Sequence, residues 1–280
     1  MYNTYNKVGN FMGYFETFKY NKSLYQLKDA LGVLVTLVIG EEKALLFDTG
    51  YGIGNLKDEI KKITNKPLIV INSHGHMDHT CGNYQFEKVY ISKEDFELCV
   101  KHNSKAWRIR NVDSAKRLNV LPIDFDEDSY IKQNHGNIEF ININDIIDLG
   151  NLKLKVIDMK GHTTGSIGLY IEQWQLMLVS DATCPFVWLF LEESTTVNVY
   201  VKMLEEVLKY EFNNFLVGHG ARLFPKQKMY DFYEIAKNID LEKSVKVSFN
   251  NFDHLNSYCY TLGRMYNQDD CGIVFDPNKM

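Results

Sequence analysis

The sequence lacks the features that would direct a chain to a membrane or to nucleic acid. Its longest apolar run, from Val33 to Ile39, is far too short to span a bilayer, which takes about 20 residues. Its formal net charge of -5 disfavours an extended nucleic-acid surface, because such a surface needs Lys and Arg to neutralise phosphates. We therefore expect no membrane partner and no nucleic-acid partner.

Cysteine is scarce, and its pattern excludes a disulfide framework. The five cysteines are scattered, odd in number and without a C-x-x-C pair. This pattern is typical of reduced thiols. The opening residues, Met1 to Asn6, lack the basic start and apolar segment of a secretory signal. Together these absences predict a cytoplasmic protein.

Nothing in the composition divides the 280 residues into parts. There is no repeat, no low-complexity tract and no Pro/Gly/Ser-rich linker, and 45% of the residues are hydrophobic, enough for a sizeable core. We predict a single domain over residues 1–280. It has a helical insertion at about 93–137 and a C-terminal extension at about 221–280.

Strand-like and helix-like patterns alternate along most of the chain. Strands are predicted at 32–39, 43–48, 68–72, 88–92, 138–143, 152–159, 166–172, 175–180 and 214–218, with a terminal hairpin from 257–263 and 272–276. Helices are predicted at 55–64, 93–118, 196–210 and 230–239, and 119–137 looks irregular. This order predicts an α/β (α+β) fold with two sheets, each covered by helices.

Seven histidines and aspartates stand where strand-like segments end. Four of them form an H-x-H-x-D-H motif directly after the buried strand 68–72, and each of the others follows a later strand. They are His74, His76, Asp78, His79, His162, Asp181 and His219. Residues i and i+2 of a loop can turn their side chains to one side, so His74 and His76 could share an ion. Imidazole and carboxylate are good ligands for zinc and other first-row metals.

A purely structural zinc site is the main alternative for this set. Such sites usually saturate one ion with cysteine-rich ligands, and no cysteine belongs to this set. Seven ligands therefore predict two ions with an open or bridging position. The isolated histidines His102, His135 and His254 are interpreted as surface or satisfied polar residues rather than ligands.

The order and spacing of these motifs resemble those of the metallo-β-lactamase superfamily, from about residue 31 to 220. The matching segments are Phe47-Asp-Thr-Gly50, Ser73-His-Gly-His-Met-Asp-His79, Gly161-His162, Ser180-Asp181 and Gly218-His219. The resemblance implies a four-layer αββα sandwich of two mixed β-sheets flanked by helices. It also implies that Asp48 orients a ligand or loop without binding metal.

The same resemblance distributes the ligands between two metals. His74, His76 and His162 would hold the first, Asp78, His79 and His219 the second, and Asp181 would bridge both. We expect two divalent ions, zinc in the first place, with iron or manganese as alternatives. The resemblance gives Asp78 a further catalytic role, in orienting the nucleophile or passing a proton to the leaving group.

These expectations predict a dinuclear metal-dependent hydrolase acting on a small-molecule substrate. Two ions that share a water lower its pKa and yield a bridging hydroxide. The bond cleaved could be an ester, lactone, thioester or phosphodiester. The alternative is an iron-dependent dioxygenase of the same fold, similar to the persulfide dioxygenases. The oligomeric state stays open, with a homodimer as one alternative.

The residue at position 181 separates branches of the superfamily. True β-lactamases generally lack a bridging carboxylate there, so the chain resembles the glyoxalase II, lactonase and phosphodiesterase branches. Arg222, Lys226 and Lys228 are candidates for a glutathione-binding patch, which the strand-like tail disfavours. Cys184 stands where the acyl-homoserine-lactone lactonases carry Tyr.

Several neighbouring residues are candidates to line the pocket. In the insertion, Trp107, Arg108 and Arg110 could form one wall that contacts an anionic substrate, or could belong to an ordinary helix with solvated arginines. Tyr51 could reach the metals. For Cys81, as for Cys184, a small buried thiol is the favoured role.

Overall fold

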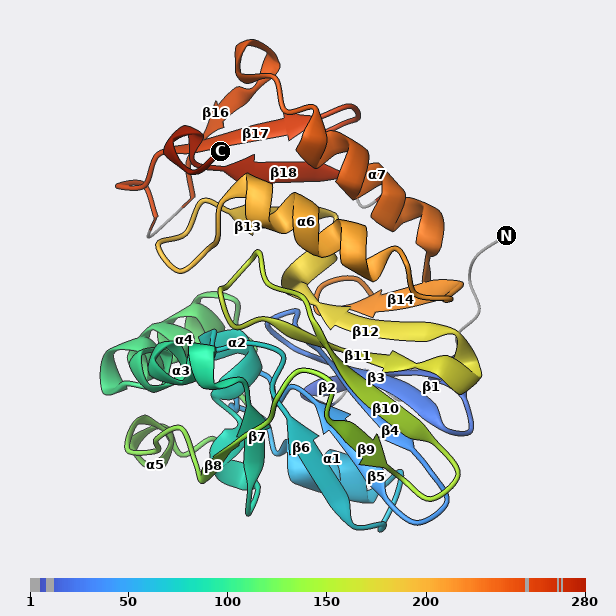
Figure 1. Ribbon diagram of the computed structural model, residues 1–280. Helices are drawn as coiled ribbons and strands as arrows, with labels where there is room; N and C mark the ends of the chain where they lie inside the picture. The colour runs from blue at the N-terminus through green and yellow to red at the C-terminus, as the bar shows by residue number, and fades with distance from the viewer. Residues whose placement is uncertain (1–5, 9–12, 250–251, 266, 268) are drawn as a thin grey trace. The chain divides into compact units, whose positions relative to one another are not determined.

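The computed structural model describes residues 6–8, 13–249, 252–265, 267 and 269–280 (Figure 1). The chain divides into two compact units, residues 1–156 and 157–280, and each is described by itself. The boundary falls inside one strand, β10 (Lys153–Asp158), so that β10 begins in the first unit and ends in the second. The single domain predicted from the sequence stays a prediction.

The first unit is built on a mixed eight-stranded sheet whose spatial order follows the sequence. Its strands are β1 (Asn6–Val8), β2 (Phe15–Asn21), β3 (Leu24–Asp29), β4 (Leu34–Ile39), β5 (Ala44–Phe47), β6 (Leu68–Ile71), β7 (Val89–Ile91) and β8 (Ile138–Phe140). Neighbouring strands are antiparallel from β1 to β5 and parallel from β5 to β8. A short strand, β9 (Ile146–Asp148), pairs antiparallel with the beginning of β10.

The helices of this unit are short. They are α1 (Leu56–Lys61), α2 (Met77–Thr80), α3 (Phe96–His102), α4 (Lys105–Arg117) and α5 (Glu127–Ile131). Strand β5 is buried along its whole length, as expected for a central strand that is apolar on both faces. Helix α1 begins after Asn55, whose side chain caps it, and buries Leu56 and Ile60 against this sheet.

The insertion differs from its prediction in two places. The helix predicted over 93–118 is broken at Asn103 and Ser104, because Ser104 is extended and begins α4 as its N-cap. The stretch 119–137, predicted to be irregular, contains α5, which Asp126 caps by accepting a hydrogen bond from the Ser129 amide.

The second unit contains two sheets. The first consists of β15 (Phe224–Pro225), β14 (Asn214–Val217), β12 (Leu176–Ser180), β11 (Ile167–Ile171) and the end of β10, in that order, with β12 and β14 parallel. The other has the order β13 (Phe186–Leu189), β18 (Gly272–Phe275), β17 (Ser257–Thr261) and β16 (Val245–Val247). The apolar faces of helices α6 (Val197–Val207) and α7 (Lys226–Lys237) share one hydrophobic core with residues of both sheets (Figure 1).

The predicted C-terminal hairpin is confirmed, since β17 pairs antiparallel with β18. The structure adds strand β13, parallel to β18, which the sequence did not reveal. Strands β1 to β3 were likewise not predicted, and α7 begins four residues earlier than expected.

The α/β class with mixed sheets is confirmed. No helix in the described part of the chain is long and apolar enough to cross a membrane.

Candidate metal centre

The seven predicted ligands follow the ends of four strands. Strand β6 leads into His74 and His76, and the single-turn helix α2 then carries Asp78 and His79. In the second unit, His162 follows β10, Asp181 follows β12 and His219 follows β14. Among the described residues, the groups that could hold a metal ion contain these seven residues and no others.

Gly75, between the first two ligands, is required by a close approach of the backbone. A Cβ atom at this position would lie 2.7 Å from the carbonyl oxygen of Asp95 and 2.8 Å from the amide nitrogen of Cys99. The Gly75 amide donates to the buried carboxylate of Asp95 at 2.7 Å. The H-x-H loop is therefore clamped against the start of α3, and Asp95 is a functional contact that the sequence did not reveal.

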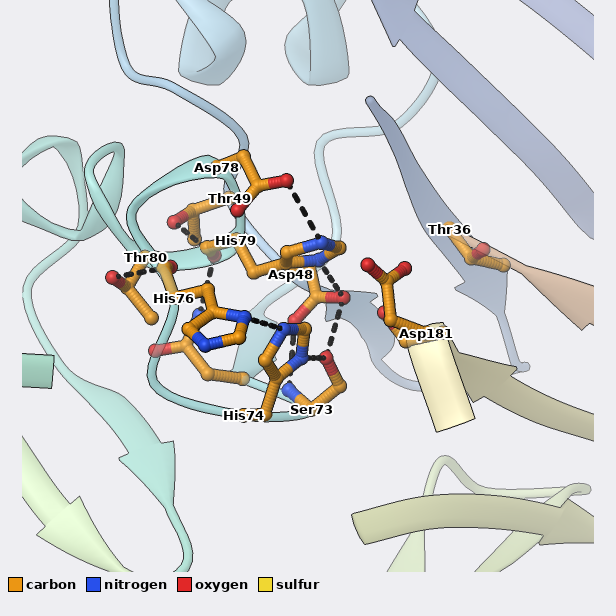
Figure 2. Close-up of polar contacts among 12 residues, drawn as sticks. Thr36, Asp48, Thr49, Ser73, His74, His76, Asp78, His79, Thr80 and Asp181 are labelled. Carbon is orange, nitrogen blue, oxygen red and sulfur yellow. Dashed lines mark hydrogen bonds and ion pairs between the residues drawn. The ribbon is translucent and has the colours of Figure 1, made fainter. Parts of the chain in front are cut away.

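Asp48 orients the H-x-H-x-D-H motif through hydrogen bonds to its carboxylate, as the resemblance predicted (Figure 2). Its carboxylate accepts hydrogen bonds from the Ser73 amide at 2.7 Å, from the Ser73 hydroxyl at 2.9 Å and from His79 Nδ1 at 2.9 Å. Asp48 is 1% exposed, so these bonds lie in a low-dielectric interior where they are strong. The φ of +71° at Asp48 is unusual for a residue other than glycine and fits a functional turn.

This network fixes the tautomers of two ligands. The single hydroxyl proton of Ser73 goes to Asp48, so its oxygen accepts from His74 Nδ1, 2.8 Å away. His79 Nδ1 also donates, to Asp48. Both imidazoles therefore carry their lone pair on Nε2.

A buried amide network supports the backbone of α2. The carbonyl oxygen of His79 accepts from Asn72 Nδ2 at 2.9 Å and from the Thr49 hydroxyl at 3.0 Å. Asn83 joins these two side chains, donating to Asn72 Oδ1 and lying 2.7 Å from the Thr49 hydroxyl. The position of Asn72 at the end of β6 was the one sequence signal for this network.

His162 is oriented by its own unit. Its Nδ1 donates to the carbonyl oxygen of Trp188, on β13, at 2.9 Å. Its Nε2 consequently carries the lone pair and lies 3.9 Å from Asp181 Oδ2. The same carboxylate oxygen lies 3.3 Å from Nε2 of His219. Asp181 thus faces two imidazoles with one oxygen atom, an arrangement suited to a bridging ligand.

The separations between ligand atoms fit pairs that share an ion. Two ligands of a tetrahedral zinc ion, at about 2.0–2.1 Å from it, lie about 3.3 Å apart. His74 Nε2 and His76 Nδ1 are 3.1 Å apart, and His79 Nε2 and Asp78 Oδ2 are 3.4 Å apart. Imidazole and carboxylate are also the donor types that first-row divalent metals prefer. The residues present therefore fit the metals that the sequence predicts.

Arg108 overturns both interpretations of its role. It is neither a substrate-contacting wall nor a solvated arginine, because it is 0% exposed. Its guanidinium lies over the rings of Tyr84 and Tyr130 and donates to the carbonyl oxygen of Cys81, which follows α2. Arg110 is the exposed member of the pair and lies over the ring of Trp107.

The remaining neighbours have mixed outcomes. Cys81 and Cys184 are buried, as predicted, and burial raises the pKa of Cys81 to about 11. His102 is a buried residue whose ring stacks on that of His76 at 5.1 Å. Tyr51 contributes its carbonyl oxygen to the Tyr130 hydroxyl, and its predicted reach to the metals stays a prediction.

The proposed glutathione patch loses support, because its three cations already have partners. Arg222 pairs with Asp269 at 2.6 Å, Lys226 donates to the carbonyl oxygen of Tyr210 at 2.7 Å, and Lys228 donates to the carbonyl oxygen of Asp269.

Comparison with known proteins identifies the class. The model of the metallo-beta-lactamase superfamily matches residues 29–219, and the chain belongs to this superfamily. Among curated relatives, the acyl-coenzyme A thioesterase MBLAC2 of Homo sapiens is 26% identical over a 167-residue alignment that covers 52% of this chain and 57% of the relative. The chain thus matches little more than half of that relative's length.

Solved structures show the same fold. The sec-alkylsulfatase Pisa1 from Pseudomonas sp. has a TM-score of 0.60 at 14% identity, covering 79% of this chain and 41% of that one. A metallo-beta-lactamase from Erythrobacter litoralis has a TM-score of 0.54 at 11% identity, covering 84% of this chain and all of that one. At these identities the likeness concerns the fold alone.

Proposed function

We propose that the chain is a metal-dependent hydrolase that cleaves acyl thioesters. The observation that carries the proposal is the pairing of donor atoms at separations suited to shared ions, on a set of seven ligands. Membership of the superfamily supports hydrolysis, and the relatives named acyl-coenzyme A thioesterases favour the thioester among the bonds that the sequence left open.

In this proposal two divalent ions, zinc in the first place, are held by seven side chains. His74, His76 and His162 would hold the first ion, Asp78, His79 and His219 would hold the second, and Asp181 would contribute to both. When bound, such ions lower the pKa of a shared water and polarise the carbonyl oxygen of the substrate.

The chain's own residues supply orientation and proton transfer. Asp48 and Trp188 keep Nε2 of His79 and His162 available as donors by accepting the proton of each Nδ1. Asp78, with 15% of its side chain exposed, orients the attacking water and carries a proton on its carboxylate to the leaving sulfur. Water adds to the acyl carbon, the carbon–sulfur bond breaks, and a carboxylic acid and a thiol are released.

Metal quantification coupled to a substrate panel tests this proposal. We expect two ions per chain and faster cleavage of acyl-coenzyme A than of matched oxygen esters, lactones or phosphodiesters. His76→Ala and Asp181→Ala should each lower kcat/KM by more than roughly 100-fold, the upper end of the effect of replacing a residue that only orients a metal ligand. The exposed His254 offers the matched control, since His254→Ala should leave kcat/KM unchanged.

Two results would contradict the proposal. One is a single iron per chain with oxygen uptake, which would favour the dioxygenase alternative. The other is the absence of thioester cleavage in every metal form, which would reduce the claim to a metal-binding protein.

A further inference from the structure

Lys279, on the single 3-10 turn Pro277–Lys279 after β18, directs its ammonium group at one loop. Nζ donates to the carbonyl oxygens of Leu191 at 2.5 Å, Glu192 at 3.0 Å and Ser194 at 3.1 Å. An ammonium group has three N–H donors, so these three contacts can use all of them. Such charge-assisted bonds are stronger than bonds between neutral groups, and the side chain is half-buried, which limits screening by solvent.

The loop that Lys279 binds, residues 191–195, in turn holds the segment that carries His162. The Ser194 hydroxyl donates to the carbonyl oxygen of His162 at 2.7 Å. Two backbone bonds flank this contact, from the Thr195 amide to Gly161 at 2.9 Å and from the Thr164 amide to Glu193 at 3.1 Å. The backbone before, at and after His162 is therefore fixed by this one loop.

The ring of His162 depends on the same region of the chain. Its Nδ1 donates to the Trp188 carbonyl on β13, and the parallel neighbour of β13 is β18. The Ser194 hydroxyl also lies 3.4 Å from that carbonyl oxygen. The C-terminal sheet thus reaches His162 by two routes, through Trp188 and through the loop that Lys279 holds.

We propose that Lys279 is a positioning residue for the metal ligand His162, and that the C-terminal segment serves the metal centre through it. The inference rests on the proposed role of His162 as a ligand. Without the ammonium group, three loop carbonyls lose a common partner and separate, and Nε2 of His162 then samples several directions. Outer contacts that orient a ligand change metal affinity by about 10–100-fold.

Titration of the metal-free protein with Co²⁺, followed by visible absorption, tests the inference in Lys279→Met. This variant keeps the length of the side chain and removes the charge and the donors. We expect about 10–100-fold weaker binding of one ion, with the affinity for the other ion and the far-ultraviolet circular dichroism unchanged. Lys279→Arg, which keeps the charge and donor groups, should restore most of the affinity.

Lys243→Met is the matched control within the same unit. Lys243 is an exposed lysine on the 3-10 turn Leu241–Lys243 and pairs with Asp240 at 2.8 Å. This variant should bind both ions as the wild type does. An equal loss of Co²⁺ affinity in Lys243→Met and Lys279→Met would overturn the inference, because the loss of any lysine would then have the same effect.

Ser194→Ala keeps the inference testable if Lys279→Met folds poorly. It removes the hydroxyl contact with His162 and leaves Lys279 in place, so it should weaken the same ion. Because both residues act through one loop, the double variant should lose little more than the more affected single variant. Multiplicative losses, or unchanged Co²⁺ affinity in both single variants, would refute the positioning role.

These measurements need no turnover. A wild-type chain without thioester cleavage would defeat the proposed function, while selective loss of one ion in Lys279→Met would still support the inference. Conversely, a working thioesterase whose two ion affinities are insensitive to both substitutions would defeat the inference alone.

Discussion

At the scale of single residues, Asp48 decides how the first-unit ligands present their nitrogens. One carboxylate accepts from His79 directly and from His74 through the Ser73 hydroxyl. Both rings therefore depend on a side chain that is itself outside the ligand set. A change of one oxygen to an NH₂ group at this position reverses the direction of a hydrogen bond without changing the size of the side chain.

Asp48→Asn is expected to lower the affinity for the ion proposed to bind His79 by about 10–100-fold. The amide NH₂ would face His79 Nδ1, so the ring would place its proton on Nε2 and lose the donor lone pair. Zinc competition with a chromophoric chelator measures the affinity. Asp113→Asn, an exposed site on α4, is the control and should have no effect. Identical affinities in the two variants would show that Asp48 does not set the tautomer.

Asp29 is a second residue with a testable role, because its burial should make the stability of the fold depend on pH. Burial raises its pKa to about 6 from an ordinary 3.8, although the amides of Tyr51, Gly32, Val33 and Leu31 act in the opposite direction. Between about pH 4 and pH 6 the folded chain keeps the proton that the unfolded chain has released. The free energy of unfolding therefore falls as pH rises through this window, by about 3 kcal/mol at about 1.4 kcal/mol per unit.

Asp29→Asn stays neutral at every pH and should lack this dependence. The unfolding free energy of the wild type minus that of the variant should decrease from pH 4 to pH 6 and then stay level. Urea unfolding at intervals of half a pH unit measures it, and the same difference for Asp113→Asn should be flat. A flat difference for Asp29→Asn would mean that the carboxylate is ionised throughout the window.

The residues of this site divide into those that the sequence reveals and those that it does not. His74 to His79 form a dense motif after a recognisable strand, and His162, Asp181 and His219 follow strands in the same way. Asp95, Trp188 and Lys279 act through contacts with distant segments, and two of them use or bind backbone carbonyls. No local pattern marks such residues, because any side chain leaves the Trp188 carbonyl in place.

At the scale of elements, Arg108 connects α4 with the end of α2. Its Nη2 lies within hydrogen-bond distance of three acceptors: the carbonyl oxygen of Cys81 at 3.2 Å, Oδ1 of Asn103 at 2.8 Å and the carbonyl oxygen of Asn134 at 2.9 Å. The contact with the Cys81 carbonyl places positive charge at the C-terminal end of α2, where it is favourable. The insertion thereby supports the helix that carries Asp78 and His79.

Arg108→Met should lower the free energy of unfolding by about 3 kcal/mol, because it leaves buried acceptors without their donor. Arg110→Met, two residues along the same helix but exposed, should change it by less than about 0.5 kcal/mol. Urea denaturation followed by circular dichroism compares them. Equal stabilities of the two variants would show that the guanidinium contributes nothing beyond the packing of its carbon chain.

Elements were predictable where the local pattern is strong and unpredictable where pairing partners decide. Strands β4, β5 and β6 are apolar runs bounded by turns, and α6 has regular apolar spacing, so each was found. Strand β13 is a four-residue segment that is ordered by pairing with β18, over eighty residues later. The break between α3 and α4 depends on the extended backbone of Ser104. The polar sequence on both sides of it is typical of an exposed helix and does not indicate the break.

At the scale of the whole molecule, the proposed ions should stabilise the folded chain, because they bind ligands that the unfolded chain does not bring together. Removal of metal by a chelator should lower the thermal midpoint. Restoring zinc at about 100 times its Kd should add about 2.7 kcal/mol of stability. Scanning calorimetry of the wild type, His76→Ala and His254→Ala measures this. A zinc-induced shift of equal size in His76→Ala would contradict the ligand assignment.

Strand β10 has a consequence for dividing this chain into pieces. A gene fragment that stops at residue 156 would end within a strand, so each piece would present an unpaired backbone edge. The turn between β9 and β10, where Gly150 adopts a φ of +105°, is a better point of division, since it leaves β10 whole. Two fragments divided at this turn would carry β9 and β10 respectively, and these two strands could pair again. This turn would therefore be a suitable place to divide the chain for a split reporter.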